Sequence, residues 1–162
     1  MKSYGDLFRS DPDWAERART FAGRVRDVTE VLSGLGEPRA PRSRMDIRVA
    51  YHDACHLGHA QGVRQQPRSL LASIPGVTLV PVAESDICCG SAGIFNLVQP
   101  EMAAELGERK ATMIADAQPD IIATTNPGCM LQIGAAFRAA GQDREIVHVV
   151  EILDASIRGV DL

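Results

Sequence analysis

Four cysteines are the residues of this 162-residue chain with the clearest capacity for chemistry: Cys55, Cys88, Cys89 and Cys129. The chain is too poor in cysteine for a disulfide scaffold, and the adjacent Cys88 and Cys89 would form a strained ring if they paired with each other. Unrelated buried thiols are one alternative, since free cysteine packs like a small hydrophobe. Grouped cysteines in a reducing compartment more often hold a metal or carry out redox chemistry.

Four thiolates can hold either zinc or an iron–sulfur cluster. Structural zinc sites usually use closely paired C-x₂₋₄-C segments, and no C-x-x-C occurs in this sequence. Iron–sulfur clusters also take four cysteines. The glycine-containing segment 90–93 would let backbone N–H groups approach anionic sulfur, and helices beginning near Pro100 and Pro127 would direct their positive ends toward it. These features favour an anionic cluster, and zinc stays open as the alternative.

An alternation of strands and helices must position these thiols. Short β-rich runs predict strands at residues 47–51, 77–82, 120–125 and 146–149. The helical spacing of apolar residues predicts helices at residues 66–74, 100–117, 127–140 and 150–158. This α/β pattern predicts a mostly parallel sheet of about four strands flanked by helices. Each of the first three strands precedes one or two of the cysteines, and the carboxyl ends of parallel strands share one edge. We therefore expect the four thiols to meet at that edge.

An extra N-terminal helix is predicted ahead of the sheet, over residues 11–35. Asp11 is a suitable N-cap with Pro12 in the first turn, and apolar residues recur every three or four positions as far as Leu32. The Pro- and Arg-rich segment 36–44 is typical of an exposed connector. The sequence thus predicts a helix and connector over the first 44 residues, followed by an α/β domain over residues 45–162.

The overall charge excludes some classes of partner. The net charge is −4 at pH 7, and no basic stripe is visible, which argues against nucleic acid as a ligand. No apolar run approaches the ~20 residues of a membrane span, and the first residues lack the apolar stretch of a secretory signal. We expect a soluble protein of the cytoplasm.

Histidines and a basic pair supply further candidates. His52, His56 and His59 flank Cys55. Each of them either donates a hydrogen bond to cluster sulfur, which would raise the reduction potential, or is an exposed or capping residue. The pair at residues 109–110, arginine followed by lysine, is most typical of a solvated helix face, with docking to a partner as the alternative.

The segments around the cysteines resemble the cysteine-rich CCG domain. They are YHDACHLGHAQGVRQQPRSLL, ICCGSAGIFNLVQPEMA, ERKATMI and NPGCMLQI, and the likeness covers roughly residues 45–155. This domain occurs in heterodisulfide reductase and in the iron–sulfur subunit of glycolate oxidase. The resemblance is closer to the C-terminal CCG repeat of the glycolate oxidase protein.

The resemblance implies that all four cysteines, Cys55, Cys88, Cys89 and Cys129, are cluster ligands. The general family pattern ends in C-x-x-C, and the first position of that pair is Asn126 here. Five cysteines hold a noncubane cluster in heterodisulfide reductase. The four cysteines of this chain suit one ordinary [4Fe–4S] cluster instead.

The surroundings of the predicted cluster complete the expected site. Gly90 and Gly93 should shape the pocket, and Asn126 should hydrogen-bond the cluster or cap its pocket. His56 and His59 are expected to line the same pocket. A structural zinc ion, or no metal in a domain that docks other subunits, is the alternative.

The resemblance also implies a function, that of an electron-transfer module in a glycolate, or more generally 2-hydroxy-acid, oxidase complex. FAD-containing subunits would take hydride from the hydroxy acid, and this chain would pass single electrons to an acceptor such as a quinone at the inner face of the membrane. The family protein also carries two ferredoxin-type motifs and a first CCG repeat. We therefore expect this chain to correspond to its C-terminal part, to be inactive toward glycolate alone and to self-associate.

Overall fold

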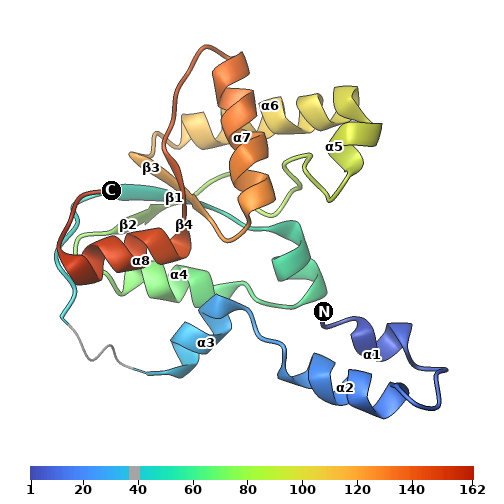
Figure 1. Cartoon of the computed structure of the whole chain (residues 1–162). Coiled ribbons are helices and arrows are strands. Elements are labelled where there is room, and N and C mark those ends of the chain that lie inside the picture. The colour runs from blue at the N-terminus through green and yellow to red at the C-terminus, as the bar shows by residue number, and fades with distance from the viewer. Residues whose placement is uncertain (37–40) are drawn as a thin grey trace.

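The computed structural model describes residues 1–36 and 41–162 and contains a four-stranded, all-parallel sheet flanked by helices (Figure 1). The strands are β1 (Arg48–His52), β2 (Thr78–Val80), β3 (Ile121–Thr124) and β4 (Ile146–His148). Their order in the sheet is β2-β1-β3-β4. The chain therefore builds outward in both directions from the central pair, β1 and β3. Thr124 of β3 lies beside both His52 and His148 at the carboxyl edge.

Helices cover both faces of the sheet, with α4 and α8 on one face and α6 and α7 on the other. The helices of the described residues are α1 (Tyr4–Leu7), α2 (Ala15–Arg24), α3 (Val28–Gly34), the π-helical turn η1 (His56–Ala60), α4 (Gln65–Ala72), α5 (Phe95–Val98), α6 (Pro100–Asp116), α7 (Pro127–Ala139) and α8 (Val149–Arg158). Successive side chains of a strand point to opposite faces. Val49 and Tyr51 accordingly pack with α4 and α8 in one core, while Ala50 packs with α6 and α7 in the other.

The predicted α/β architecture is confirmed, and its main helices and strands lie close to their predicted positions. Pro100 and Pro127 occupy the first turns of α6 and α7, where a missing backbone N–H has no cost. The second strand is shorter than predicted, because β2 ends just before Pro81, and proline cannot donate to the strand ladder.

The prediction of one continuous helix over residues 11–35 is wrong, because the chain forms two helices there, α2 and α3. Val25 between them is extended. The carboxylate of Asp27 accepts a hydrogen bond from the Thr29 N–H, and the carboxylate of Glu30 accepts one from the Asp27 N–H. This reciprocal capping box starts a new helix, although the apolar spacing continues across the break.

The N-terminal helices form a small aromatic cluster of their own. Tyr4 of α1 stacks on Phe21 of α2, with ring centroids 5.8 Å apart. Part of the predicted exposed connector, residues 37–40, lies outside the described residues. Within the described part of the chain, no helix is both long enough and apolar enough to cross a membrane.

Candidate metal centre

The four cysteines come together at the carboxyl edge of the sheet. Cys55 follows β1 at the start of η1, Cys88 and Cys89 lie in the loop after β2, and Cys129 lies in the first turn of α7, directly after β3. All four are free thiols; Cys89 and Cys129 are buried, whereas the other two are half-buried. The strand order reverses between β1 and β3, and open α/β sheets bind ligands beside such a point.

His52, Cys89 and Cys129 form the buried part of the site. A ring nitrogen of His52 and the two sulfur atoms all lie within 4.8 Å of one another. His52 is only 1% exposed, and neither of its ring nitrogens has a hydrogen-bond partner among the described residues. A buried polar group without a partner is costly, and bound metal and sulfide would supply one. The donor set therefore fits a metal–sulfur group.

The thiols influence one another's ionisation. The interaction with the Cys129 thiol, aided by the facing His52 ring, lowers the pKa of Cys89 in spite of its burial. The same interaction, together with burial and the other thiols, raises the pKa of Cys129. Burial and the neighbouring Cys88 thiol raise the pKa of Cys55. One buried thiolate therefore forms readily, and a multivalent cation is needed to hold all four sulfurs ionised together.

The Cys-Cys-Gly loop requires glycine at its third position. The Gly90 N–H donates a hydrogen bond to the Cys88 sulfur at 3.3 Å. Gly90 has a φ of +92° and lies so close to the Ala103 carbonyl of α6 that a side chain would collide with it. Since only glycine combines this backbone conformation with so close an approach, residue 90 must be glycine for the loop to pack against α6 in this way.

Asn126 organises the other side of the site. Its Oδ1 accepts a hydrogen bond from the Cys129 N–H at 3.1 Å, which caps α7. Its Nδ2 lies 3.3 Å from Nδ1 of His56. Asn126 thus fixes the start of the helix that carries Cys129 and links it to the turn that follows Cys55.

Two of the predicted pocket residues lie elsewhere. His59 is exposed, and its Nδ1 lies 3.0 Å from Nη2 of Arg64. Because the turn after Cys55 is π-helical, residues three apart do not share the face expected of an α-helix. Gly93 is exposed, with open space around it and a φ of +67°. It permits the chain to turn but does not line the site.

His52 is the buried histidine of the site, and it was not predicted to differ from His56 and His59. The signal was the alternation of strand residues. His52 lies two residues after Ala50 in β1, so the two side chains point to the same face of the sheet. Ala50 packs in the core that also contains Cys89 and Cys129. Its ring is therefore directed to the face that holds the buried thiols.

The buried carboxylate of Asp53, just before Cys55, is paired with Arg68 of α4 and bonded to Ser85 in the loop that leads to Cys88. Arg68 donates two hydrogen bonds of 2.5 Å to the carboxylate of Asp53, and the Ser85 hydroxyl donates a third at 2.9 Å. Burial opposes the charge on Asp53, but the Arg68 guanidinium and the Ser85 hydroxyl together lower the pKa of this carboxyl. The ion pair therefore stabilises the loops that carry the cysteines and lies outside the group of four sulfur atoms.

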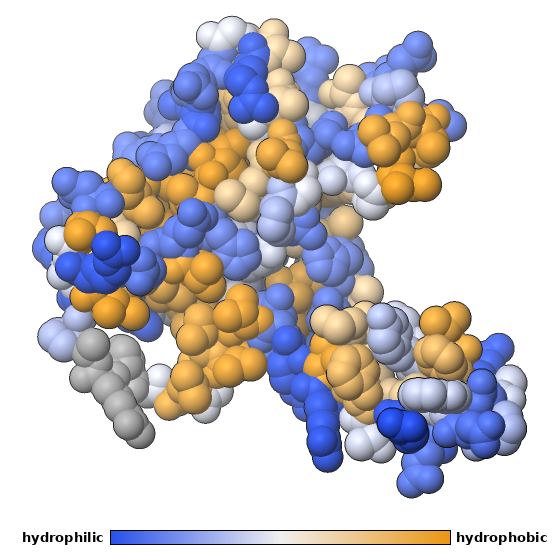
Figure 2. Space-filling model, viewed as in Figure 1, coloured by the Kyte–Doolittle hydropathy of each residue, from blue (hydrophilic) through white to orange (hydrophobic). Residues whose placement is uncertain are grey.

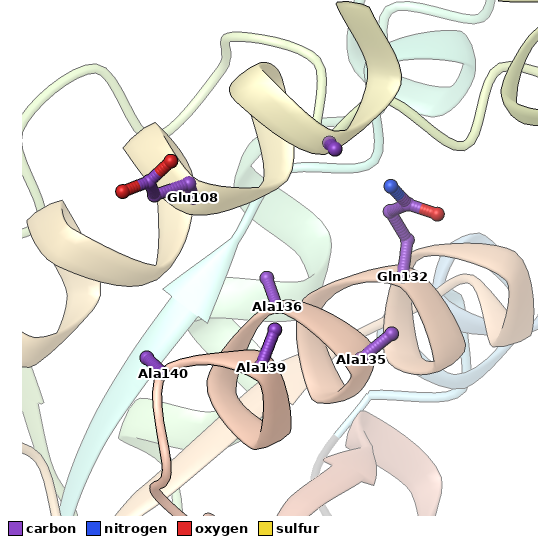
Figure 3. Close-up of a pocket in the computed structure, with 7 residues that line it drawn as sticks. Glu108, Gln132, Ala135, Ala136, Ala139 and Ala140 are labelled. Carbon is purple, nitrogen blue, oxygen red and sulfur yellow. The ribbon is translucent and has the colours of Figure 1, made fainter. Parts of the chain in front are cut away.

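A hollow lies between α6 and α7 (Figure 3). Most of its lining residues are alanines, together with Glu108 and Gln132. The Gln132 amide already donates to the Ala103 carbonyl at 3.0 Å. The residues described around this hollow include no thiol or imidazole.

Comparison with known proteins agrees with this site. The model of the cysteine-rich domain family CCG matches residues 49–134. "Lactate utilization protein A" of Oceanobacillus iheyensis is 30% identical over 159 residues, which cover 98% of this chain and 65% of that protein. The "Probable glycolate oxidase iron-sulfur subunit" of Bacillus subtilis is 33% identical over 161 residues, which cover 94% of this chain and 35% of that protein. The chain thus spans only part of the length of each relative.

Proposed function

Because the chain belongs to the CCG cysteine-rich domain family, we propose that it is an electron-transfer module whose thiols hold an iron–sulfur cluster. The ligands in this proposal are Cys55, Cys88, Cys89 and Cys129. When bound, the cluster supplies one-electron chemistry. The residues of the chain bind it, orient it and exclude water from its buried side.

One observation carries the proposal: two buried sulfurs and an unpartnered imidazole lie together at the edge where two half-buried thiols also arrive. A neutral ligand would leave the thiolates uncompensated, whereas iron ions balance their charge. Four thiolates with hydrogen-bonding groups around them are typical of iron–sulfur ligation. We propose a [4Fe–4S] cluster, one of the two cluster types that four cysteines hold.

The names of the relatives support a place in the oxidation of 2-hydroxy acids. One is named for lactate utilization and the other for glycolate oxidase. In our proposal, FAD-containing subunits oxidise the hydroxy acid, and this module carries single electrons toward an acceptor such as a quinone. The complex would lie in the cytoplasm, at the inner face of the membrane. Nucleic acid has no place in this scheme.

Anaerobic purification tests the proposed cofactor directly. We expect a brown protein with broad visible absorption and with iron and acid-labile sulfide in equal amounts, as a [4Fe–4S] cluster requires. The measurement is iron, sulfide and zinc analysis per chain, before and after exposure to air. A colourless protein that contains zinc and no sulfide would overturn the proposal.

An exposed apolar surface over α5 is the proposed site of self-association. Figure 2 shows hydrophobic side chains gathered over this helix, where Ile94, Leu97 and Val98 are exposed. Apolar patches of this kind commonly mark protein contacts. We expect Leu97→Lys to reduce self-association in sedimentation velocity, whereas Leu35→Lys, at an equally exposed leucine beyond α3, should not. A wild-type protein that stays monomeric at high concentration would contradict this proposal.

A further inference from the structure

Lys110 of α6 is buried in the wall of the site. Its side chain is only 1% exposed and is among the largest fully buried side chains of the described residues. The sequence predicted a solvated basic pair at this position, and for Lys110 that prediction is wrong. The prediction fits only Arg109, whose side chain is 53% exposed.

The contacts of Lys110 leave its charge uncompensated by protein carboxylates. Its Nζ donates a hydrogen bond to the backbone carbonyl of Glu84, in the loop that leads to Cys88. The Glu84 carboxylate instead pairs with Arg109 at 2.5 Å. Among the described residues, no carboxylate lies within ion-pair distance of Lys110. Buried charges are normally paired or bound to an opposite charge, so Lys110 needs another anionic neighbour.

That neighbour lies on the sulfur side of α6. One turn before Lys110, a Cβ atom placed on Gly107 would lie 3.7 Å from the Cys89 backbone carbonyl oxygen, an ordinary contact distance, so α6 runs beside the backbone of Cys89. Burial lowers the pKa of Lys110, and among the anionic groups that raise it again Cys89 acts most strongly, ahead of the carboxylates. A Cys89 thiolate beside α6 therefore favours the charged form of Lys110.

We propose that Lys110 is a fixed positive charge that compensates the anionic metal–thiolate centre and favours its reduced form. This inference rests on the proposed function. An iron–sulfur centre gains one negative charge on reduction. A nearby ammonium in a region of low dielectric therefore stabilises the reduced state more than the oxidised state. Lys110 needs no direct bond to the metal for this effect.

Lys110→Met in the full chain, loaded with cluster, tests the inference. We expect the equilibrium between oxidised and reduced centre to shift about tenfold toward the oxidised form, which is about 59 mV for a one-electron couple. Iron loss to a chelator should also be faster. Arg109→Met is the matched control, since it removes a positive charge from the adjacent, exposed position of the same helix. Its potential should stay close to that of the wild type.

A second neutral variant, Lys110→Gln, separates the loss of the positive charge from a change in side-chain packing. Urea unfolding of the apo proteins verifies that each variant is folded. A lowered potential in both variants supports the inference, as does failure of a folded variant to retain the cluster while the Arg109→Met protein retains it. Unchanged potential and unchanged iron retention in both Lys110 variants overturn it and leave the cluster proposal intact. A wild-type chain without iron and sulfide overturns both.

Discussion

Cys89→Ser is expected to abolish stable cluster binding. We expect a loss of more than about 100-fold in metal affinity, because changes that leave the ligands themselves in place already cost roughly 10–100-fold. The Cys89 side chain is 1% exposed, and its sulfur lies in the buried group with His52 and Cys129. A serine hydroxyl stays protonated there and is a poor ligand for iron. Iron and sulfide content after anaerobic purification and a chelator challenge measures the loss.

Ser91→Ala is the matched control for this variant. Ser91 lies two residues further along the same loop and carries no thiol, so its replacement tests whether any disturbance of the loop releases the cluster. Urea unfolding of the apo proteins separates loss of a ligand from loss of the fold. If Cys89→Ser retained wild-type amounts of iron and sulfide, the assignment of Cys89 as a ligand would be wrong.

The meeting of the thiols at one edge could be predicted, because it depends only on topology. Strands that alternate with helices form a parallel sheet, and residues that follow neighbouring parallel strands share one edge. The cysteines after β1, β2 and β3 obey this rule, although up to 74 positions separate them. The role of Gly90 was also predictable, since a glycine directly after two cysteines indicates a close backbone approach.

Features that depend on a specific polar contact or on an irregular turn were not predictable from apolar spacing. Apolar spacing assigns a lysine to the solvated side of a helix, but Lys110 is buried because the Glu84 carbonyl accepts a hydrogen bond from its ammonium group. His59 was expected to line the pocket, but it lies exposed in the π-helical turn η1. The helix break at Val25 depends on a local capping box that the apolar pattern conceals. For Lys110 and for the helix break at Val25, a specific polar contact overrides the periodicity.

Asp53→Asn is expected to destabilise the apo protein by about 2 kcal/mol, because hydrogen bonds to charged groups contribute roughly 1.5–3 kcal/mol and the Arg68 side chain, which is 31% exposed, can still reach solvent. Asp53 is 4% exposed, and its carboxylate accepts two hydrogen bonds from Arg68 and one from Ser85. The Asp53 N–H also donates to the Ser85 carbonyl at 3.2 Å. Since these residues join the loops of Cys55 and Cys88, retention of iron should fall as well.

Asp154→Asn provides the matched comparison, since Asp154 pairs with Arg158 at 3.2 Å on the exposed face of α8. Exposed pairs of this kind contribute about 0–1 kcal/mol, so the same chemical change should have little effect there. Urea unfolding of both apo variants measures the difference, and chelator-driven iron loss measures the effect on the site. Equal unfolding midpoints for the two variants would show that Asp53 does not brace the cysteine loops. A large loss of stability in Asp53→Asn alone, accompanied by faster iron loss, would show that the charged pair holds the two half-buried thiols in place for the metal.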